Sequence, residues 1–199
     1  MTQPPVIRIF FAIDLPENLK LQLGEFMVSL KKKAKSNAIR WTKAENLHVT
    51  LQFLAAVHAE HLTLLVKNVR AEIEGAIDHI LLNVGDLNLL PNPYRPRVIV
   101  LDITPQTELA MVSQVIGRGI QATQYEIESR LFRAHLTVGR IKHAKGVNLD
   151  FLSEMHIPEM SPALIKEVVL FQSEPQPEGS SHYTVLERIP LRAHWTDQV

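Results

Sequence analysis

Two short motifs, His48-Val49-Thr50-Leu51 and His135-Leu136-Thr137-Val138, each place a hydroxyl group two residues after an imidazole. An imidazole titrates near neutral pH, so it can take a proton from water or give one to a departing oxygen. A neighbouring hydroxyl group could hold the non-bridging oxygens of a phosphate. The two motifs together could therefore supply a general base and a general acid for opening a phosphate ester, each worth roughly 10²–10⁴-fold in rate.

The pattern His-x-Thr does not by itself select these two motifs, because it also occurs at His61 and His182. His61 lies in a stretch with helical periodicity, where residues two positions apart point in different directions, so we expect a surface histidine there. His182 precedes a predicted strand and could border a site, with a structural role as the alternative. His48 and His135 differ from both because they lie inside apolar strands.

Strand geometry places the two functional groups of each motif side by side. Successive side chains on a strand point to opposite faces, so His48 and Thr50 share one face while the apolar residues around them, including Phe53, share the other. The same argument puts His135 and Thr137 on one face of their strand. We expect the apolar face of each strand to pack on a core.

The two motif strands belong to a chain in which strands and helices alternate. Apolar runs predict strands at residues 6–13, 46–54, 80–90, 97–103, 132–141, 165–172 and 183–189. Helical spacing predicts one helix after the first strand and others at residues 59–74 and 105–122. Asp14 and Glu17 resemble a capping box for the first helix. Its lysine-rich end, residues 31–35, is interpreted as a solvated helix terminus, with an RNA-contacting patch as the alternative.

The chain also contains an internal repeat. Residues 8–16 and 97–105 align without a gap, each from an arginine to a proline and each leading into a helix. A strand with one of the two motifs follows in both halves. A duplicated unit with pseudo-twofold symmetry would bring the motif strands together across a central cleft, whereas chance similarity between two strand–helix units is the alternative.

Composition narrows the classes of function. The chain has 0 cysteines, which excludes disulfides and thiolate chemistry, and we see no His-Glu-x-x-His pattern, so we expect neither a metal nor a cofactor. A formal net charge of +0 argues against a protein that grips long nucleic acid and favours recognition of one end or one linkage. No signal-peptide layout or membrane-length apolar run is present, so we expect a cytoplasmic protein without a membrane partner, and a monomer.

Together these features resemble the 2H phosphoesterase superfamily, specifically its bacterial RNA 2′,3′-cyclic phosphodiesterase branch, historically called 2′-5′ RNA ligase. The resemblance covers nearly the whole chain. It rests on residues 8–16 (RIFFAIDLP), 40–41, 47–54 (LHVTLQFL), 96–98, 132–140 (FRAHLTVGR) and a C-terminal strand that contains Tyr183. It implies a single bilobal α+β domain over residues 1–199, with two antiparallel sheets around a cleft, helices on the outside and no metal requirement.

The resemblance also implies an activity, the hydrolysis of RNA 2′,3′-cyclic phosphate ends to 2′-phosphates. In that reaction His48 would be the general acid for the 3′-oxygen and His135 the base that activates water. Thr50 and Thr137 would bind the phosphate. The partners would be RNA 3′ ends or nucleotides that bear a 2′,3′-cyclic phosphate.

Three further residues are candidates for substrate binding. Arg140 matches a family position that contacts phosphate, but strict alternation puts it on the face opposite His135 unless a bulge at Gly139 returns it to the cleft. Phe11 could stack on a terminal base, with a place in the core as the alternative. Tyr183 is included because its strand belongs to the resemblance.

Two other functions would use the same groups. Reversible joining of RNA ends through a 2′-5′ linkage would use the same groups in reverse. A nucleotide-binding module would use the cleft without turnover, although the presence of both histidines and both threonines favours catalysis. A metallohydrolase is less consistent with the sequence because no ligand cluster has the required spacing.

Overall fold

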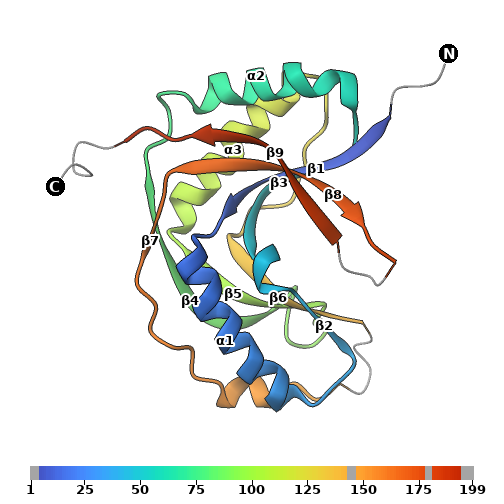
Figure 1. Ribbon diagram of the computed structural model, residues 1–199, viewed down its shortest axis with the longest axis vertical. Coiled ribbons are helices and arrows are strands. Elements are labelled where there is room, and N and C mark those ends of the chain that lie inside the picture. The colour runs from blue at the N-terminus through green and yellow to red at the C-terminus, as the bar shows by residue number, and fades with distance from the viewer. Residues whose placement is uncertain (1–4, 143–146, 178–180, 194–199) are drawn as a thin grey trace.

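Two antiparallel sheets form the framework of the computed structural model, which describes residues 5–142, 147–177 and 181–193 (Figure 1). The four-stranded sheet has the order β3 (His48–His58), β1 (Val6–Asp14), β8 (Glu167–Pro175) and β9 (Ser181–Pro190). The five-stranded sheet has the order β2 (Ile39–Trp41), β6 (His135–Ile141), β5 (Val98–Thr104), β4 (Ile80–Leu90) and β7 (Ala163–Ile165). The helices of the described residues are α1 (Glu17–Ala34), α2 (Leu62–Ile73) and α3 (Gln106–Gln121), with short 3-10 turns η1 (Ala44–Asn46), η2 (Ala59–His61) and η3 (Asp150–Glu154).

The two motif strands occupy matching places in the two sheets. β3 pairs with β1, which leads into α1, and β6 pairs with β5, which leads into α3. β3 and β6 contact each other, and Figure 1 shows both near the middle of the molecule, where the two sheets meet. The predicted α+β fold with two antiparallel sheets and a pseudo-twofold repeat is therefore confirmed.

The sheets and helices share one hydrophobic core. Its largest fully buried side chains include Ile9, Phe11 and Ile13, which form the inward face of β1. α3 packs on β3 of the other sheet, where the side-chain amide of Gln52 donates to the carbonyl and the hydroxyl of Ser113, each at 3.0 Å. The helix of one half thus supports the motif strand of the other half.

The predicted elements differ from the observed ones mainly at their ends. The strand predicted at residues 46–54 starts at His48 and runs on to His58, and the strand predicted from residue 132 starts only at His135. β2 and β7 were not predicted because three residues are too few to show a period. No helix in the described parts of the chain is long and apolar enough to cross a membrane.

The predicted capping box at the start of α1 is wrong. Pro16 is the N-cap residue and α1 has no side-chain cap hydrogen bond. Asp14 instead forms an ion pair of 2.6 Å with the largely buried Lys20, one turn into the helix. The carboxylate is therefore held on the motif side of β1 rather than at the helix terminus.

The lysine-rich end of α1 is exposed, and Lys33 forms an ion pair of 3.0 Å with Glu154. Basic residues in the last helical turn complement the helix dipole. The structure thus favours the interpretation of residues 31–35 as a solvated helix end.

Candidate active site

The first motif fixes the ring of His48 by two hydrogen bonds. Its Nδ1 lies 2.8 Å from the backbone oxygen of Asn46, and its Nε2 lies 3.0 Å from the hydroxyl oxygen of Thr50. Because a carbonyl oxygen only accepts, Nδ1 carries the proton and donates it to Asn46. In the neutral ring Nε2 then accepts from Thr50, and it is the nitrogen free to exchange a proton with a substrate.

The second motif repeats this arrangement. Nδ1 of His135 lies 2.7 Å from the backbone oxygen of Arg133, which again is the residue two positions before the histidine. Nε2 of His135 is therefore also the nitrogen available for proton transfer. His48 and His135, one in each half of the repeat, thus both leave Nε2 available to a substrate.

A carboxylate stands opposite each histidine in the neighbouring strand. Asp14 pairs in register with His48, and Asp102 pairs in register with His135. A cation partly neutralises each carboxylate, because Asp14 lies 2.6 Å from Lys20 and Asp102 lies 2.7 Å from Arg133. These carboxylates were missed in the sequence, since only the strand register reveals that they face the histidines.

An aromatic environment surrounds the imidazole of His48. The ring centroid of Phe10 lies 4.7 Å away, and the ring of Tyr183 lies edge-on at 5.3 Å. Burial lowers the pKa of His48 to about 4, and the charges of Arg140 and Lys20 act in the same direction. The hydrogen bond to Asn46 and the charge of Asp14 oppose the shift without cancelling it. His48 is therefore neutral at neutral pH in the free protein.

This shift predicts an acid sensitivity of the fold. Between pH 6.5 and about 4 the unfolded chain binds a proton at His48 that the folded protein does not bind, so stability falls as the pH falls. We expect the free energy of unfolding of the wild type to lose about 3 kcal/mol more over this interval than that of His48→Gln. Urea unfolding of both proteins across the interval measures the difference. Parallel pH dependences would contradict the prediction.

A bulge directly after Thr137 of the second motif determines where Arg140 points. Ile99 pairs with Gly139 while the next residue of β5, Val100, pairs with Thr137, so β6 contains one extra residue at this point. The extra residue reverses the alternation and returns Arg140 to the face of Thr137. The bulge anticipated at Gly139 is thus present, and Arg140 faces the cleft.

Gly139 also lets strand β2 approach closely. A Cβ atom built on Gly139 would lie 3.0 Å from the Cγ2 of Ile39 and 3.2 Å from the ring of Trp41. Thr42, which follows β2, donates from its hydroxyl to the backbone oxygen of Thr137 at 2.8 Å. The small residue therefore allows β2 to cover the edge of β6 beside the second motif.

The first motif has a bulge of its own, directly after Thr50. Phe11 pairs with Gln52 while Ala12 pairs with Thr50, which leaves one extra residue in β3. The expectation that Phe53 lies on the core face is therefore wrong, because the bulge moves it to the face of Thr50, where it is 39% exposed.

The first motif lies in a cavity of about 800 Å³, which we call the motif cavity. It brings together four predicted site residues, His48, Thr50, Arg140 and Tyr183. His135 and Thr137 are not part of its lining but lie on β6, on the same face as Arg140 and beside β3. The full lining consists of Arg8, Phe10, Arg40, Trp41, Thr42, Lys43, Asn46, His48, Thr50, Phe53, Ala55, Glu128, Arg130, Arg140, Ser173, Ser181 and Tyr183.

The expectation that Phe11 stacks on a base is wrong. Phe11 is 0% exposed and belongs to the main core, because it lies on the inward face of β1. Its neighbour Phe10 lies on the other face, where it stacks on Phe171 at 5.2 Å and lines the motif cavity. Both faces of β1 carry apolar residues, so the sequence alone could not show which phenylalanine faces the cleft.

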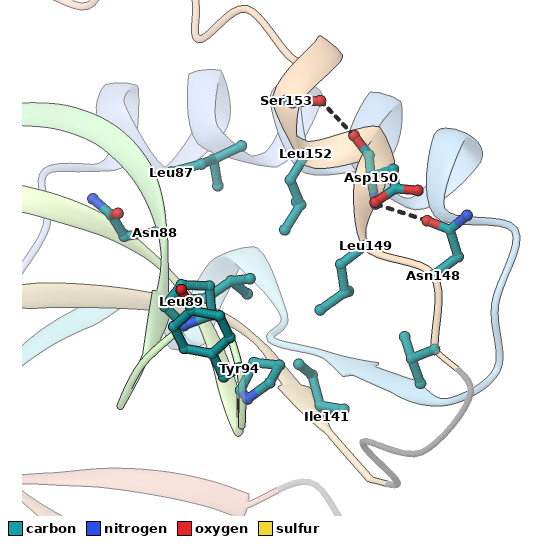
Figure 2. Close-up of a pocket in the computed structure, with 13 residues that line it drawn as sticks. Leu87, Asn88, Leu89, Tyr94, Ile141, Asn148, Leu149, Asp150, Leu152 and Ser153 are labelled. Carbon is teal, nitrogen blue, oxygen red and sulfur yellow. Dashed lines mark hydrogen bonds between the residues drawn. The ribbon is translucent and has the colours of Figure 1, made fainter.

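A second cavity, of about 790 Å³, lies elsewhere on the five-stranded sheet and contains none of the predicted site residues (Figure 2). Apolar side chains such as Leu87, Leu89 and Leu152 contribute much of its wall. Two of its polar groups are already engaged, since the backbone N–H of Asp150 donates to the side chain of Asn148 at 2.7 Å. The motif cavity is therefore the better candidate for chemistry. Among the described residues no group of three or more histidine, aspartate or glutamate side chains could hold a metal ion.

Known proteins resemble this chain in sequence and in fold. The family model described as LigT like Phosphoesterase matches residues 13–100, which include the first motif. An RNA 2′,3′-cyclic phosphodiesterase of Archaeoglobus fulgidus is 24% identical over 173 residues, covering 87% of this chain and 94% of that protein. An RNA 2′,3′-cyclic phosphodiesterase of Methanocaldococcus jannaschii is 26% identical over 183 residues, covering 91% of this chain and 99% of that protein.

Solved structures show the same fold. The crystal structure of LigT from E. coli complexed with 3′-AMP superposes with a TM-score of 0.73 at 25% identity, covering 94% of this chain and 99% of that one. A protein of Thermus thermophilus superposes with a TM-score of 0.72 at 22% identity over 94% of this chain and 99% of its own. The structural match thus extends well beyond the residues of the family model.

Proposed function

Because the chain carries a LigT-like phosphoesterase domain, as its motifs predicted, we propose that it hydrolyses RNA 2′,3′-cyclic phosphate ends to 2′-phosphates without a metal ion. One observation carries the proposal: both histidines donate from Nδ1 to the carbonyl two residues earlier, at equivalent points of two lobes. Each ring therefore offers Nε2 for proton transfer, and the reaction needs two such groups.

The reaction transfers two protons. A base removes a proton from water as its oxygen attacks phosphorus, and an acid protonates the ribose 3′-oxygen as the bond between phosphorus and that oxygen breaks. The product keeps its phosphate on the 2′-oxygen. We assign the acid to His48 and the base to His135, which is the assignment that the family resemblance implies.

The protonation state of His48 adds a condition to this assignment. Its lowered pKa leaves the ring neutral in the free protein, so an acid at this position must take up a proton as the substrate binds. The negative charge of a cyclic phosphate favours that uptake, because a nearby anion stabilises the protonated ring. Asp14, opposite His48 in the strand pair, acts in the same direction.

The other polar groups hold the phosphate. The hydroxyl of Thr50 donates to His48 in this structure, and on substrate binding it can turn to a non-bridging oxygen. Thr137 occupies the equivalent place on β6, and Arg140 faces the same side after the bulge. A guanidinium group can bind two oxygens of one phosphate at once, which suits it to this position.

The test is turnover by the wild-type protein of an oligonucleotide that ends in a 2′,3′-cyclic phosphate, in the presence of EDTA. We expect a 2′-phosphate product, identified by chromatography against 2′- and 3′-phosphate standards, at a rate that EDTA does not change. Absence of hydrolysis would overturn the proposed activity. Loss of activity on chelation, restored by a divalent metal, would overturn the metal-independent mechanism.

A further inference from the structure

Two arginines lie directly opposite each other at the mouth of the motif cavity. Arg40 on β2 pairs in register with Arg140 on β6, and both residues are exposed and line the cavity. Residues directly opposite in an antiparallel pair project to the same face, with their Cα atoms about 4.5–5.5 Å apart. The two guanidinium groups therefore start from adjacent points on one face of the sheet.

This pairing is unfavourable without a ligand. Like charges directly opposite in a sheet destabilise it. Within the part of the chain that the structure describes, neither arginine has an ion-pair partner, although most other arginines do. The ion-paired arginines are Arg70, Arg118, Arg130, Arg133, Arg188 and Arg192. A bound anion would relieve the repulsion between Arg40 and Arg140.

The motif cavity concentrates positive charge more generally. Its lining also includes Arg8 and Lys43, of which Lys43 lies 3.6 Å from Glu45, while Glu128, the one carboxylate among its described lining residues, is already paired with Arg130. The whole chain has a net charge of +0, so this concentration is local. The cavity is therefore suited to a ligand with more than one negative charge.

The opposite wall of the cavity is aromatic. Phe10, Phe53 and Tyr183 come from the four-stranded sheet, and Phe53 occupies the place after the first bulge that Arg140 occupies after the second. At this one place the four-stranded sheet carries an aromatic ring and the five-stranded sheet a cation, although Arg8 of β1 and Trp41 of β2 also line the cavity. A basic groove with an aromatic wall is the usual design for binding a single nucleic-acid strand.

From this arrangement we infer a second phosphate-binding site, centred on Arg40, for the phosphodiester that precedes the terminal nucleotide of the substrate. The inference rests on the proposed function, in which Arg140 serves the reacting phosphate. Arg40 lies one strand farther out, and neighbouring strands are about 4.8 Å apart, so it reaches the next phosphate along the chain. The preferred substrate is then an oligonucleotide rather than a cyclic mononucleotide.

Kinetics with two substrates test this site. We would compare kcat/KM for a 2′,3′-cyclic mononucleotide with kcat/KM for a dinucleotide that ends in the same cyclic nucleotide. We expect the wild type to prefer the dinucleotide at least about tenfold, and Arg40→Gln to reduce that preference about tenfold, as for the loss of one charged contact. The slope of log kcat/KM for the dinucleotide against log salt should become shallower by about 0.7.

A matched variant separates this site from general charge effects. Arg97→Gln removes the same charge from an exposed residue that does not line the motif cavity, and it should leave the preference unchanged. Arg40→Gln should melt at or slightly above the wild-type temperature, because it relieves repulsion. An equal loss with both substrates, or an equal effect of Arg97→Gln, would overturn the assignment of Arg40.

Binding measurements keep the inference testable if the proposed activity fails. The affinities of a mononucleoside 3′-phosphate and of a dinucleotide with the same 3′-phosphate end can be measured by calorimetry. We expect tighter binding of the dinucleotide, reduced about tenfold in Arg40→Gln. Equal affinities of the two ligands for the wild type would overturn the second phosphate site, whereas absence of cyclic phosphate hydrolysis alone would overturn only the proposed function.

Discussion

Replacement of either His48 or His135 by alanine should lower kcat/KM for an oligonucleotide with a 2′,3′-cyclic phosphate end by about 10²–10⁴-fold. Each variant removes one of the two groups that move protons in the proposed reaction. The kcat/KM of the double variant should be only slightly lower than that of the less active single variant, because acid and base act on the same transition state. Initial rates over a range of substrate concentrations measure both effects.

The matched control is His61→Ala. His61 begins another His-x-Thr sequence, but it is exposed and bonds the hydroxyl of Tyr125 at 2.8 Å, away from the motif cavity. Its activity should remain close to that of the wild type. Near wild-type turnover in both His48→Ala and His135→Ala, with folding verified by thermal unfolding, would refute the two-histidine mechanism.

The His61 control also shows what the sequence could and could not decide. A predicted position inside an apolar strand separated His48 and His135 from the other two His-x-Thr sequences, and in the structure each is the first residue of its strand, β3 or β6. The same alternation rule failed beyond each motif. Bulges after Thr50 and Thr137 reverse the faces, and an extra residue in one strand becomes visible only when its partner strand is known.

The assignment of Phe11 to substrate binding failed for a different physical reason. β1 lies in the interior of the four-stranded sheet and carries apolar side chains on both faces, so its pattern does not distinguish core from cleft. Arg40 was not predicted to bind substrate because β2 is too short to be recognised as a strand. Its position opposite Arg140 depends on the pairing of β2 with β6, and β2 can approach β6 because Gly139 has no side chain.

The identity of the general acid can be determined with a substrate whose leaving group needs no proton. The ribose 3′-oxygen departs as a strongly basic alkoxide unless it is protonated, whereas nitrophenolate departs readily as an anion. A variant without the acid should therefore lose activity on the cyclic phosphate and largely keep it on a nitrophenyl phosphodiester. A variant without the base should lose activity on both substrates, because water must be activated in each case.

We expect His48→Ala to show the first pattern and His135→Ala the second, with a difference of about 10²–10⁴-fold in the ratio of the two activities. Its lowered pKa keeps His48 neutral in the free protein, so His48 can act as the acid only if substrate binding protonates its ring. Binding of a nucleoside phosphate at pH 6–7 should then take up a proton, which calorimetry detects in buffers with different ionisation enthalpies. The reverse ratio, with no proton uptake, would make His48 the base and His135 the acid.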